Sequence, residues 1–204
     1  MTLINVLDKE LAMTIYTINF DPIGKLTDEQ FYLLCRHNPQ TKFERNAQGE
    51  IVIMSPTGGE TGRYNIEIAT EFVIWNRQVK LGVLFDSSTC FKLPSGADRS
   101  PDVAWIKQER WERLTPQQKE QFPPIAPDFV LELMSPSDSL KDLQKKMQEY
   151  LDNGVRLGWL INRKQRQVEI YRQGQAIEIF NAPPTLSGEE ILPGFTLDLN
   201  FIWN

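Results

Sequence analysis

Hydrophobic residues recur with a helical period in one long segment that begins after residue 57. Between Thr57 and Gly82 the apolar positions fall three or four residues apart, which places them on one face of an α-helix. The members of this stripe are Tyr64, Ile68, Phe72, Trp75 and Val79. Thr57 and Glu60 have the spacing of a capping box. We therefore expect the helix to begin near Thr57 and to end at Gly82.

Two shorter segments show the same period. Residues 26–36 predict a short helix, in which Thr27 and Gln30 have capping-box spacing. Residues 139–153 predict a second helix, followed by Gly154, which suits the left-handed position after a helix end. The apolar stripe of this second helix consists of Leu140, Leu143, Met147, Tyr150 and Leu151.

Extended segments lie between these helices. Residues 41–54 contain two extended runs around Asn46–Gly49 and predict a β-hairpin. Other strands are predicted at 82–86, 89–93, 101–106 and 128–133, with a short helix and loop at 107–127 and a β-meander at 156–162, 167–172 and 175–180. The order of elements predicts an α/β (α+β) fold with a C-terminal meander.

The length of 204 residues fits one domain with a short extension. Residues 1–20 are unpatterned, so we divide the chain into an N-terminal extension with a short helix (1–39) and a single domain (40–204). The chain shows no secretory leader and no apolar run long enough to span a membrane, and its two cysteines are far apart. A reduced, cytoplasmic protein without membrane contact is the expectation.

Charge and composition narrow the function classes. The net charge of −5 argues against a protein that coats nucleic acid nonspecifically. It does not exclude a nuclease, because a basic cleft can lie on an acidic body and bound metal ions add positive charge. His37 is the single histidine, which disfavours a histidine zinc site, a Ser-His-Asp triad and a Cys-His pair.

Two acidic residues occupy positions that hydrophobic burial alone would not select. Asp102 stands at the head of the Val-Ala-Trp-Ile strand, and Glu132 lies inside Phe-Val-Leu-Glu-Leu. On a strand, Glu132 shares its face with Val130, while its adjacent apolar neighbours point the other way. An ionised carboxylate there needs a cation, a metal or water beside it. An edge strand with a hydrated Glu132 side, or an ordinary ion pair, would also explain this position.

The helix after Glu132 carries a lysine near the predicted buried face. At about 100° per residue, Lys146 lies beside the apolar stripe, roughly 90° from its centre, whereas Lys145 lies nearly opposite and faces solvent. Packing of this helix on the sheet would let Lys146 reach a carboxylate at the strand end. The alternative is a surface pair between Asp142 and Lys146, four residues apart.

Four segments in a fixed order carry a resemblance to a known family. They are Ser-Pro-Asp-Val-Ala-Trp-Ile, Pro-Asp-Phe-Val-Leu-Glu-Leu-Met-Ser-Pro-Ser-Asp, Asp-Leu-Gln-Lys-Lys-Met-Gln-Glu-Tyr and Asn-Gly-Val-Arg-Leu-Gly-Trp-Leu-Ile. The chain resembles, over roughly residues 40–200, a large bacterial family of endonuclease-like proteins long described as a domain of unknown function. This family belongs to the PD-(D/E)XK, restriction-endonuclease-like superfamily. The resemblance implies a restriction-endonuclease-like mixed central sheet flanked by helices.

The resemblance also implies roles for individual residues. Asp102 matches the central metal ligand and Glu132 a second ligand, with the main-chain carbonyl of Leu133 as a third. The superfamily usually has a lysine two residues after the acid, where this chain has Met134. The family places its lysine on the next helix instead, and Lys146 matches that position.

The first long helix contributes an additional glutamate in some members of the superfamily. Glu60 and Glu67 are the candidates here, although a solvated helix face explains both equally well. The family often has a histidine after the position of Glu60, where this chain has Thr61. At this position the first long helix departs from the family pattern.

The implied activity is endonucleolytic hydrolysis of phosphodiesters in DNA, or alternatively in RNA, with Mg²⁺ or Mn²⁺ as cofactor. These cations prefer oxygen ligands and activate a bound water. The family suggests a homodimer. Two other hypotheses remain open: a non-enzymatic binding or assembly module that retains the nuclease fold, and a glycosidase that uses Asp102 and Glu132 as paired carboxylates.

Overall fold

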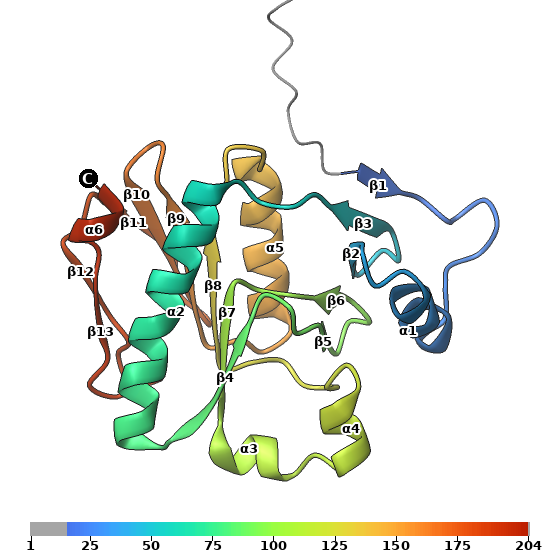
Figure 1. Ribbon diagram of the computed structural model, residues 1–204, viewed down its shortest axis with the longest axis horizontal. Coiled ribbons are helices and arrows are strands. Elements are labelled where there is room, and N and C mark those ends of the chain that lie inside the picture. The colour runs from blue at the N-terminus through green and yellow to red at the C-terminus, as the bar shows by residue number, and fades with distance from the viewer. Residues whose placement is uncertain (1–15, 204) are drawn as a thin grey trace, which may run out of the picture.

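A computed structural model of the protein describes residues 16–203, and its centre is a six-stranded mixed sheet (Figure 1). The strand order is β11-β10-β9-β8-β7-β4, and only the β8–β9 pair is parallel. The bounds are Gly82–Asp86 (β4), Val103–Lys107 (β7), Phe129–Leu133 (β8), Leu157–Asn162 (β9), Gln167–Arg172 (β10) and Glu178–Asn181 (β11). The mixed sheet and the β9–β10–β11 meander are confirmed, with β11 starting three residues later than predicted.

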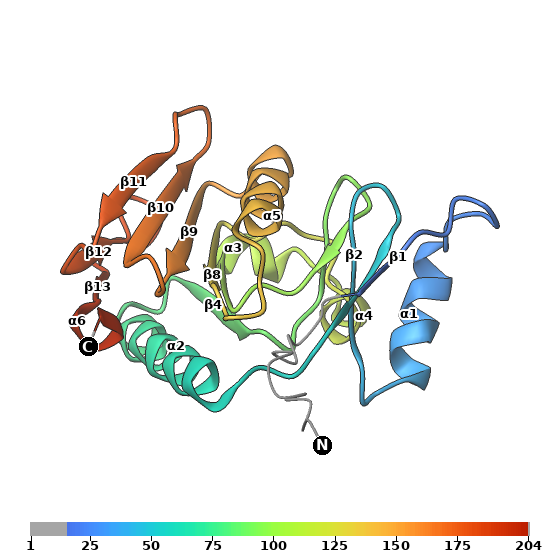
Figure 2. The ribbon, with the colours of Figure 1, turned by 90° about the horizontal axis from the view of Figure 1, so that it is seen from above.

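Two helices cover opposite faces of this sheet, as Figure 2 shows. Helix α2 (Gly59–Val79) packs its stripe on the face that carries Phe129, Leu131 and Leu133. Helix α5 (Leu140–Asp152) packs on the other face, which carries Val130. The alternation of β8 is thus as predicted, and both faces of the strand are buried because each is covered by a helix.

The C-terminal segment closes the α2 side of the core. Strands β12 (Thr185–Ser187) and β13 (Thr196–Asp198) form a separate two-stranded sheet, followed by α6 (Asn200–Trp203). Leu186, Leu197 and Ile202 from these elements join the same buried cluster as the α2 stripe. The C-terminal segment is therefore packed against the first long helix.

A second, smaller sheet lies beside the first, with the order β1-β3-β2-β6-β5. Its strands are Tyr16–Ile18 (β1), Lys42–Arg45 (β2), Ile51–Met54 (β3), Phe91–Lys92 (β5) and Asp98–Arg99 (β6). The predicted hairpin is β2–β3. Helix α1 (Asp28–His37) begins with the predicted capping box at Thr27 and buries Phe31 against Ile51 and Cys90. Two further short helices are α3 (Gln108–Glu112) and α4 (Pro116–Glu120).

Several local predictions were wrong. Residues 16–18, assigned to an unpatterned extension without a strand, pair with β3, while residues 1–15 of that segment lie outside the described residues. The strand expected at 89–93 covers only two residues, and β6 was not predicted. The capping box at Thr57 and Glu60 does not form, because the N-cap is Gly58 and makes no side-chain cap bond.

Gly82 has a different role from the one predicted. Helix α2 ends at Val79, and Lys80 takes the left-handed conformation at φ 54°. Gly82 is the first residue of β4, where a Cβ atom would lie 2.3 Å from the carbonyl oxygen of Ile106 and 2.4 Å from the ring of Trp105. The glycine is required by close packing between β4 and β7.

Candidate active site

Asp102 and Glu132 come together at one end of the large sheet. Asp102 directly precedes β7, and the main-chain N–H of Leu133 donates to its Oδ2 at 2.8 Å. Glu132 lies in β8, between β7 and β9, and is 5% exposed. The hypothesis of a hydrated edge strand for Glu132 is therefore wrong, and the carboxylate needs a partner inside the protein.

Lys146 is the cation beside Glu132. Its Nζ lies 2.8 Å from Glu132 Oε1 and 2.9 Å from Oε1 of a second carboxylate, Glu44. Lys146 itself is buried, which is deeper than the boundary position predicted for it. Lys145 is exposed and pairs with Asp142, so the alternative pair between Asp142 and Lys146 does not form.

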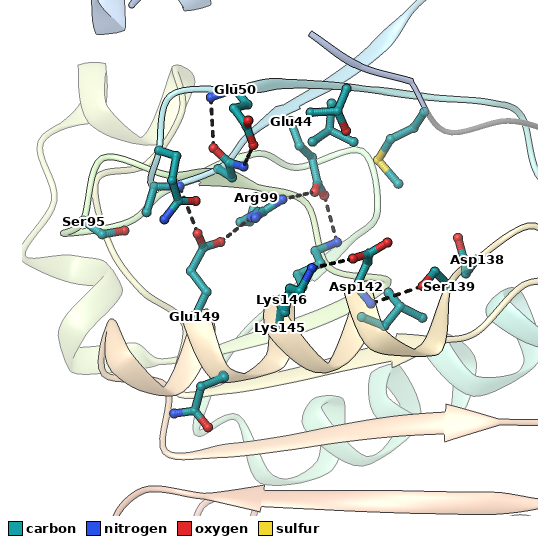
Figure 3. Close-up of a pocket in the computed structure, with 18 of the residues that line it drawn as sticks. Glu44, Glu50, Ser95, Arg99, Asp138, Ser139, Asp142, Lys145, Lys146 and Glu149 are labelled. Carbon is teal, nitrogen blue, oxygen red and sulfur yellow. Dashed lines mark hydrogen bonds and ion pairs between the residues drawn. The ribbon is translucent and has the colours of Figure 1, made fainter. Parts of the chain in front are cut away.

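Glu44 connects the small sheet to this ion pair. It lies in β2, and it also accepts hydrogen bonds from the Ser100 N–H at 2.9 Å and from the Arg99 guanidinium at 3.0 Å. Arg99 forms a second ion pair with Glu149 of α5. The contacts of Glu44, Arg99, Lys146 and Glu149 can be followed in Figure 3. The sequence did not single out Glu44 or Arg99.

The two glutamates beside Lys146 differ in their electrostatic setting. Burial opposes ionisation of Glu44, but the Lys146 and Arg99 cations outweigh it and lower its pKa to about 2. Burial raises the pKa of Glu132 to about 7, against the attraction of Lys146. Glu132 also accepts a hydrogen bond from the Tyr150 hydroxyl at 2.9 Å. Glu44 is therefore ionised at neutral pH, whereas the pKa of Glu132 lies close to neutral pH.

Asp102 differs from both glutamates because no cation contacts it among the described residues. Its polar contacts are the Leu133 N–H and the side-chain amide of Asn65, whose Nδ2 lies 3.4 Å from Asp102 Oδ1. Burial raises the pKa of Asp102 above its usual value, and the hydrogen bond from Leu133 opposes this shift. The other end of the Asn65 amide, Oδ1, is buried without a hydrogen-bond partner in the described part of the chain.

Asn65, rather than a glutamate, is thus the α2 residue that contacts the acidic site. Glu60 is exposed and Glu67 is half-buried on the outer side of α2, where both pair with Arg63. Thr61 is buried in the same helix. Asp102, Glu132, Leu133 and Lys146 lie together at one end of the sheet. Glu60 and Glu67 contact Arg63 instead and do not join this group.

The donor atoms around Asp102 suit a hard cation. Between residues 16 and 203, no group of three or more histidine, cysteine, aspartate and glutamate side chains is placed to hold a metal. A Mg²⁺ site typically needs only one or two carboxylates, however, with waters completing the shell. The carboxylates of Asp102 and Glu132 and the unpartnered Oδ1 of Asn65 are oxygen donors of this kind. The residues therefore fit Mg²⁺ or Mn²⁺ in chemistry.

A groove of about 920 Å³ opens next to this site. One wall is the face of the small sheet that carries Thr17, Val52 and Glu44, and the other is α5 with Asp142 and Lys146 (Figure 3). The groove reaches Glu44 and Lys146 but neither Asp102 nor Glu132. Its remaining charged lining is largely acidic: Glu50, Asp138, Glu149 and Asp152, with Arg99 and Lys145. A polyanion would therefore reach Asp102 more favourably from outside this groove.

A mixed sheet between two helices, with an aspartate, a glutamate and a lysine at one end, defines a restriction-endonuclease-like nuclease fold. Comparison with known proteins agrees with this class. The family model Uma2, described as "Putative restriction endonuclease", matches residues 28–200. The chain therefore belongs to the Uma2 family.

A solved structure provides the second comparison. The crystal structure of "a putative nuclease belonging to DUF820" from Anabaena variabilis superposes with a TM-score of 0.67 at 20% sequence identity. The match covers 80% of this chain and 90% of that chain, and it supports the fold. No curated protein matches the chain significantly. Family membership supports a nuclease-like function.

The described residues also bear on membrane association. Across residues 16–203, none of the helices combines the length and apolar character needed to cross a bilayer.

Proposed function

We propose that this protein is a metal-dependent endonuclease that hydrolyses phosphodiester bonds in DNA, with Asp102, Glu132 and Lys146 as its catalytic residues. One observation carries the proposal: Lys146 contacts Glu132 directly, and Asp102, which no cation contacts within residues 16–203, lies at the same sheet end. A partly exposed carboxylate without a counter-charge is an incomplete site in electrostatic terms. RNA is the alternative substrate.

A divalent cation held by Asp102 and Glu132, with the Leu133 carbonyl as a further oxygen, would supply charge stabilisation and an activated water. The chain's own residues prepare this position. The Leu133 N–H and the Asn65 amide orient the Asp102 carboxylate. Tyr150 fixes Glu132 by a hydrogen bond and excludes water from its inner side. Burial raises the pKa of Glu132, and a positive group beside this carboxylate would oppose that shift by favouring the ionised form.

Lys146 has a separate role in this proposal. Burial opposes the charged form of Lys146, but the carboxylates of Glu132 and Glu44 outweigh it and raise its pKa, so the side chain remains an ammonium group at neutral pH. The ammonium can donate hydrogen bonds to a phosphoryl oxygen and offset the charge that builds up during hydrolysis. Glu44 and Arg99 position Lys146 from the opposite side. Glu60 and Glu67 stay candidates for an accessory role, but their pairing with Arg63 favours ordinary ion pairs on the surface of α2.

Calorimetric titration with Mn²⁺ tests the proposal, with Asp102→Asn beside the wild type. Asparagine keeps an oxygen that can accept the Leu133 hydrogen bond but removes the charge. Glu71→Gln is the matched control, because it removes one carboxylate from the exposed face of α2. We expect saturable binding by the wild type and Glu71→Gln, loss of binding in Asp102→Asn, and plasmid cleavage that follows the same pattern.

Other outcomes of this titration lead elsewhere. Cleavage by Asp102→Asn at the wild-type rate would contradict the proposed site. Metal binding without cleavage of DNA or RNA would favour the non-enzymatic module, and glycoside hydrolysis without any metal requirement would favour the glycosidase hypothesis. A homodimer and a cytoplasmic location remain predictions; light scattering during size-exclusion chromatography measures the first.

A further inference from the structure

Two cations near Asp102 make no ion pair within residues 16–203. Most basic side chains around the site are occupied: Lys146 and Arg99 contact Glu44, Lys145 contacts Asp142, and Arg63 contacts Glu60 and Glu67. Lys42 and Arg163 are different. Neither side chain donates a hydrogen bond to a described residue or forms a salt bridge with one. Both are only partly exposed, so each keeps an uncompensated charge at a partly desolvated position.

The strand register places Lys42 toward the acidic site. Lys42 and Glu44 are two residues apart in β2, so their side chains leave the same face of the small sheet. Opposite them in β3 are Met54 and Val52, which line the groove beside α5 together with Glu44. Glu44 contacts Lys146, which in turn contacts Glu132. Lys42 therefore leaves the small sheet on the same side as the residue that connects this sheet to the acidic site.

Arg163 reaches the same end of the sheet from the other side. It directly follows β9, which runs parallel to β8, so it emerges at the end where the Leu133 N–H binds Asp102. The Arg163 guanidinium lies 4.0 Å from the centre of the Tyr64 ring. Tyr64 is the neighbour of Asn65, whose amide contacts Asp102. This end of the sheet, where α2 begins, is uppermost in Figure 1.

The contacts of Tyr64 show which of its two arginines is available. Arg63 also lies over this ring, at 4.2 Å, but its guanidinium is held by two glutamates. Arg163 has no acid, and its Nε is buried without a partner in the described residues. A planar guanidinium that is stacked on a ring keeps its outer N–H groups in a fixed plane, which suits recognition of a phosphate.

We propose that Lys42 and Arg163 bind backbone phosphates of a DNA strand on the two sides of Asp102. The inference rests on the proposed nuclease function and deepens it by naming the residues that position the substrate. It also explains how an acidic protein binds DNA: the strand lies over the end of the sheet, between two unpaired cations, and avoids the acidic groove beside α5. Lys42 and Arg163 are positioning residues and take no part in the chemical step.

Fluorescence anisotropy with a short labelled DNA duplex tests this inference separately from cleavage. The titration is done in Ca²⁺, which takes oxygen ligands like those of Mg²⁺, over a series of salt concentrations. We expect Lys42→Gln and Arg163→Gln each to weaken binding on the order of fivefold. Each should also reduce the slope of log affinity against log salt concentration by the amount that about one phosphate contact contributes. The charge-matched control is Lys164→Gln, an exposed lysine in the turn next to Arg163, which leaves binding unchanged.

Conservative variants separate charge from packing. Arg163→Lys and Lys42→Arg keep the positive charge, and we expect them to retain most of the wild-type affinity, with thermal unfolding confirming that each variant is folded. Wild-type affinity and salt slope in both glutamine variants would overturn the inference while leaving the nuclease proposal intact. A wild type that binds DNA through these residues but never cleaves it supports the inference and defeats the proposed catalysis. A wild type that binds no DNA overturns both.

Discussion

Lys146 Nζ lies 2.8 Å from Glu132 Oε1, and both side chains are more than nine-tenths buried. The pair forms across the interface between α5 and the central strand β8, and Glu44 adds a second carboxylate to the same ammonium group. A buried charge that loses its partner is strongly destabilising, whereas a surface pair contributes little. The same geometry therefore predicts effects on stability as well as on activity.

Replacing Lys146 by methionine should lower the free energy of unfolding by about 3–5 kcal/mol, because Glu44 and Glu132 lose their shared cation. Lys145→Met is the matched control, since its pair with Asp142 is exposed, and its effect should stay within about 0.5 kcal/mol. Urea denaturation measures both. Equal destabilisation of the two variants would show that the buried network does not exist in solution.

The acid stability of the protein should depend on Glu44. Its pKa is about 2 in the folded protein, below the usual 4.5, so its contribution is present above about pH 4.5 and lost as the pH falls toward 2. Between about pH 5 and pH 3 we expect the wild type to lose about 2 kcal/mol more than Glu44→Gln does. Denaturation curves at several pH values test this, and parallel pH profiles would contradict it.

Asn65→Ala should weaken Mn²⁺ binding about tenfold, because the variant removes an amide that orients Asp102 and an oxygen without a partner. Thr70→Ala, on the exposed side of the same helix, serves as the control: its hydroxyl donates to the Ile66 carbonyl and to no other group in the described part of the chain. Calorimetry compares the two variants. An unchanged affinity in Asn65→Ala would restrict the cation site to the carboxylates.

Gly82→Ala should destabilise the fold by about 2–3 kcal/mol or more, because the new Cβ would overlap the Ile106 carbonyl and the Trp105 ring. Gly59→Ala, at the start of α2, meets no atom within 4 Å and should be neutral or stabilising by about 0.5 kcal/mol. Thermal unfolding distinguishes the two glycines, and a stable Gly82→Ala protein would contradict the close packing of β4 on β7.

The core of the site was accessible from the sequence because it depends on local periodicity. Alternation along Phe129–Leu133 placed Glu132 on the face opposite its apolar neighbours, and helical rotation placed Lys146 near the buried side of α5. Both inferences need only the geometry of one element. The resemblance to the nuclease family then predicted that Asp102, Glu132 and Lys146 belong to one site.

Glu44, Arg99 and Asn65 were not predicted, because their roles depend on packing between distant segments. In the sequence, Glu44 is one charge among several in an ordinary hairpin, and Arg99 lies in a two-residue strand too short to detect. Asn65 follows Tyr64 of the apolar stripe, and nothing local shows that it faces Asp102. The start of α2 was misplaced because Thr57 and Glu60 have the spacing of a capping box without its hydrogen bonds.

Two contacts between the hairpin and α5 span most of the length of the domain: Glu44 with Lys146, and the Ala47 N–H with Glu149, each pair 102 residues apart in sequence. Contacts between such distant residues form late in folding, since a long loop must close first. The large sheet and its helices can therefore assemble while Lys146 still has Glu132 as its single acidic partner. The site is therefore complete only when the whole chain has folded. A fragment without residues 42–54 would keep the central sheet but lose β2, the strand whose Glu44 holds Lys146 in place.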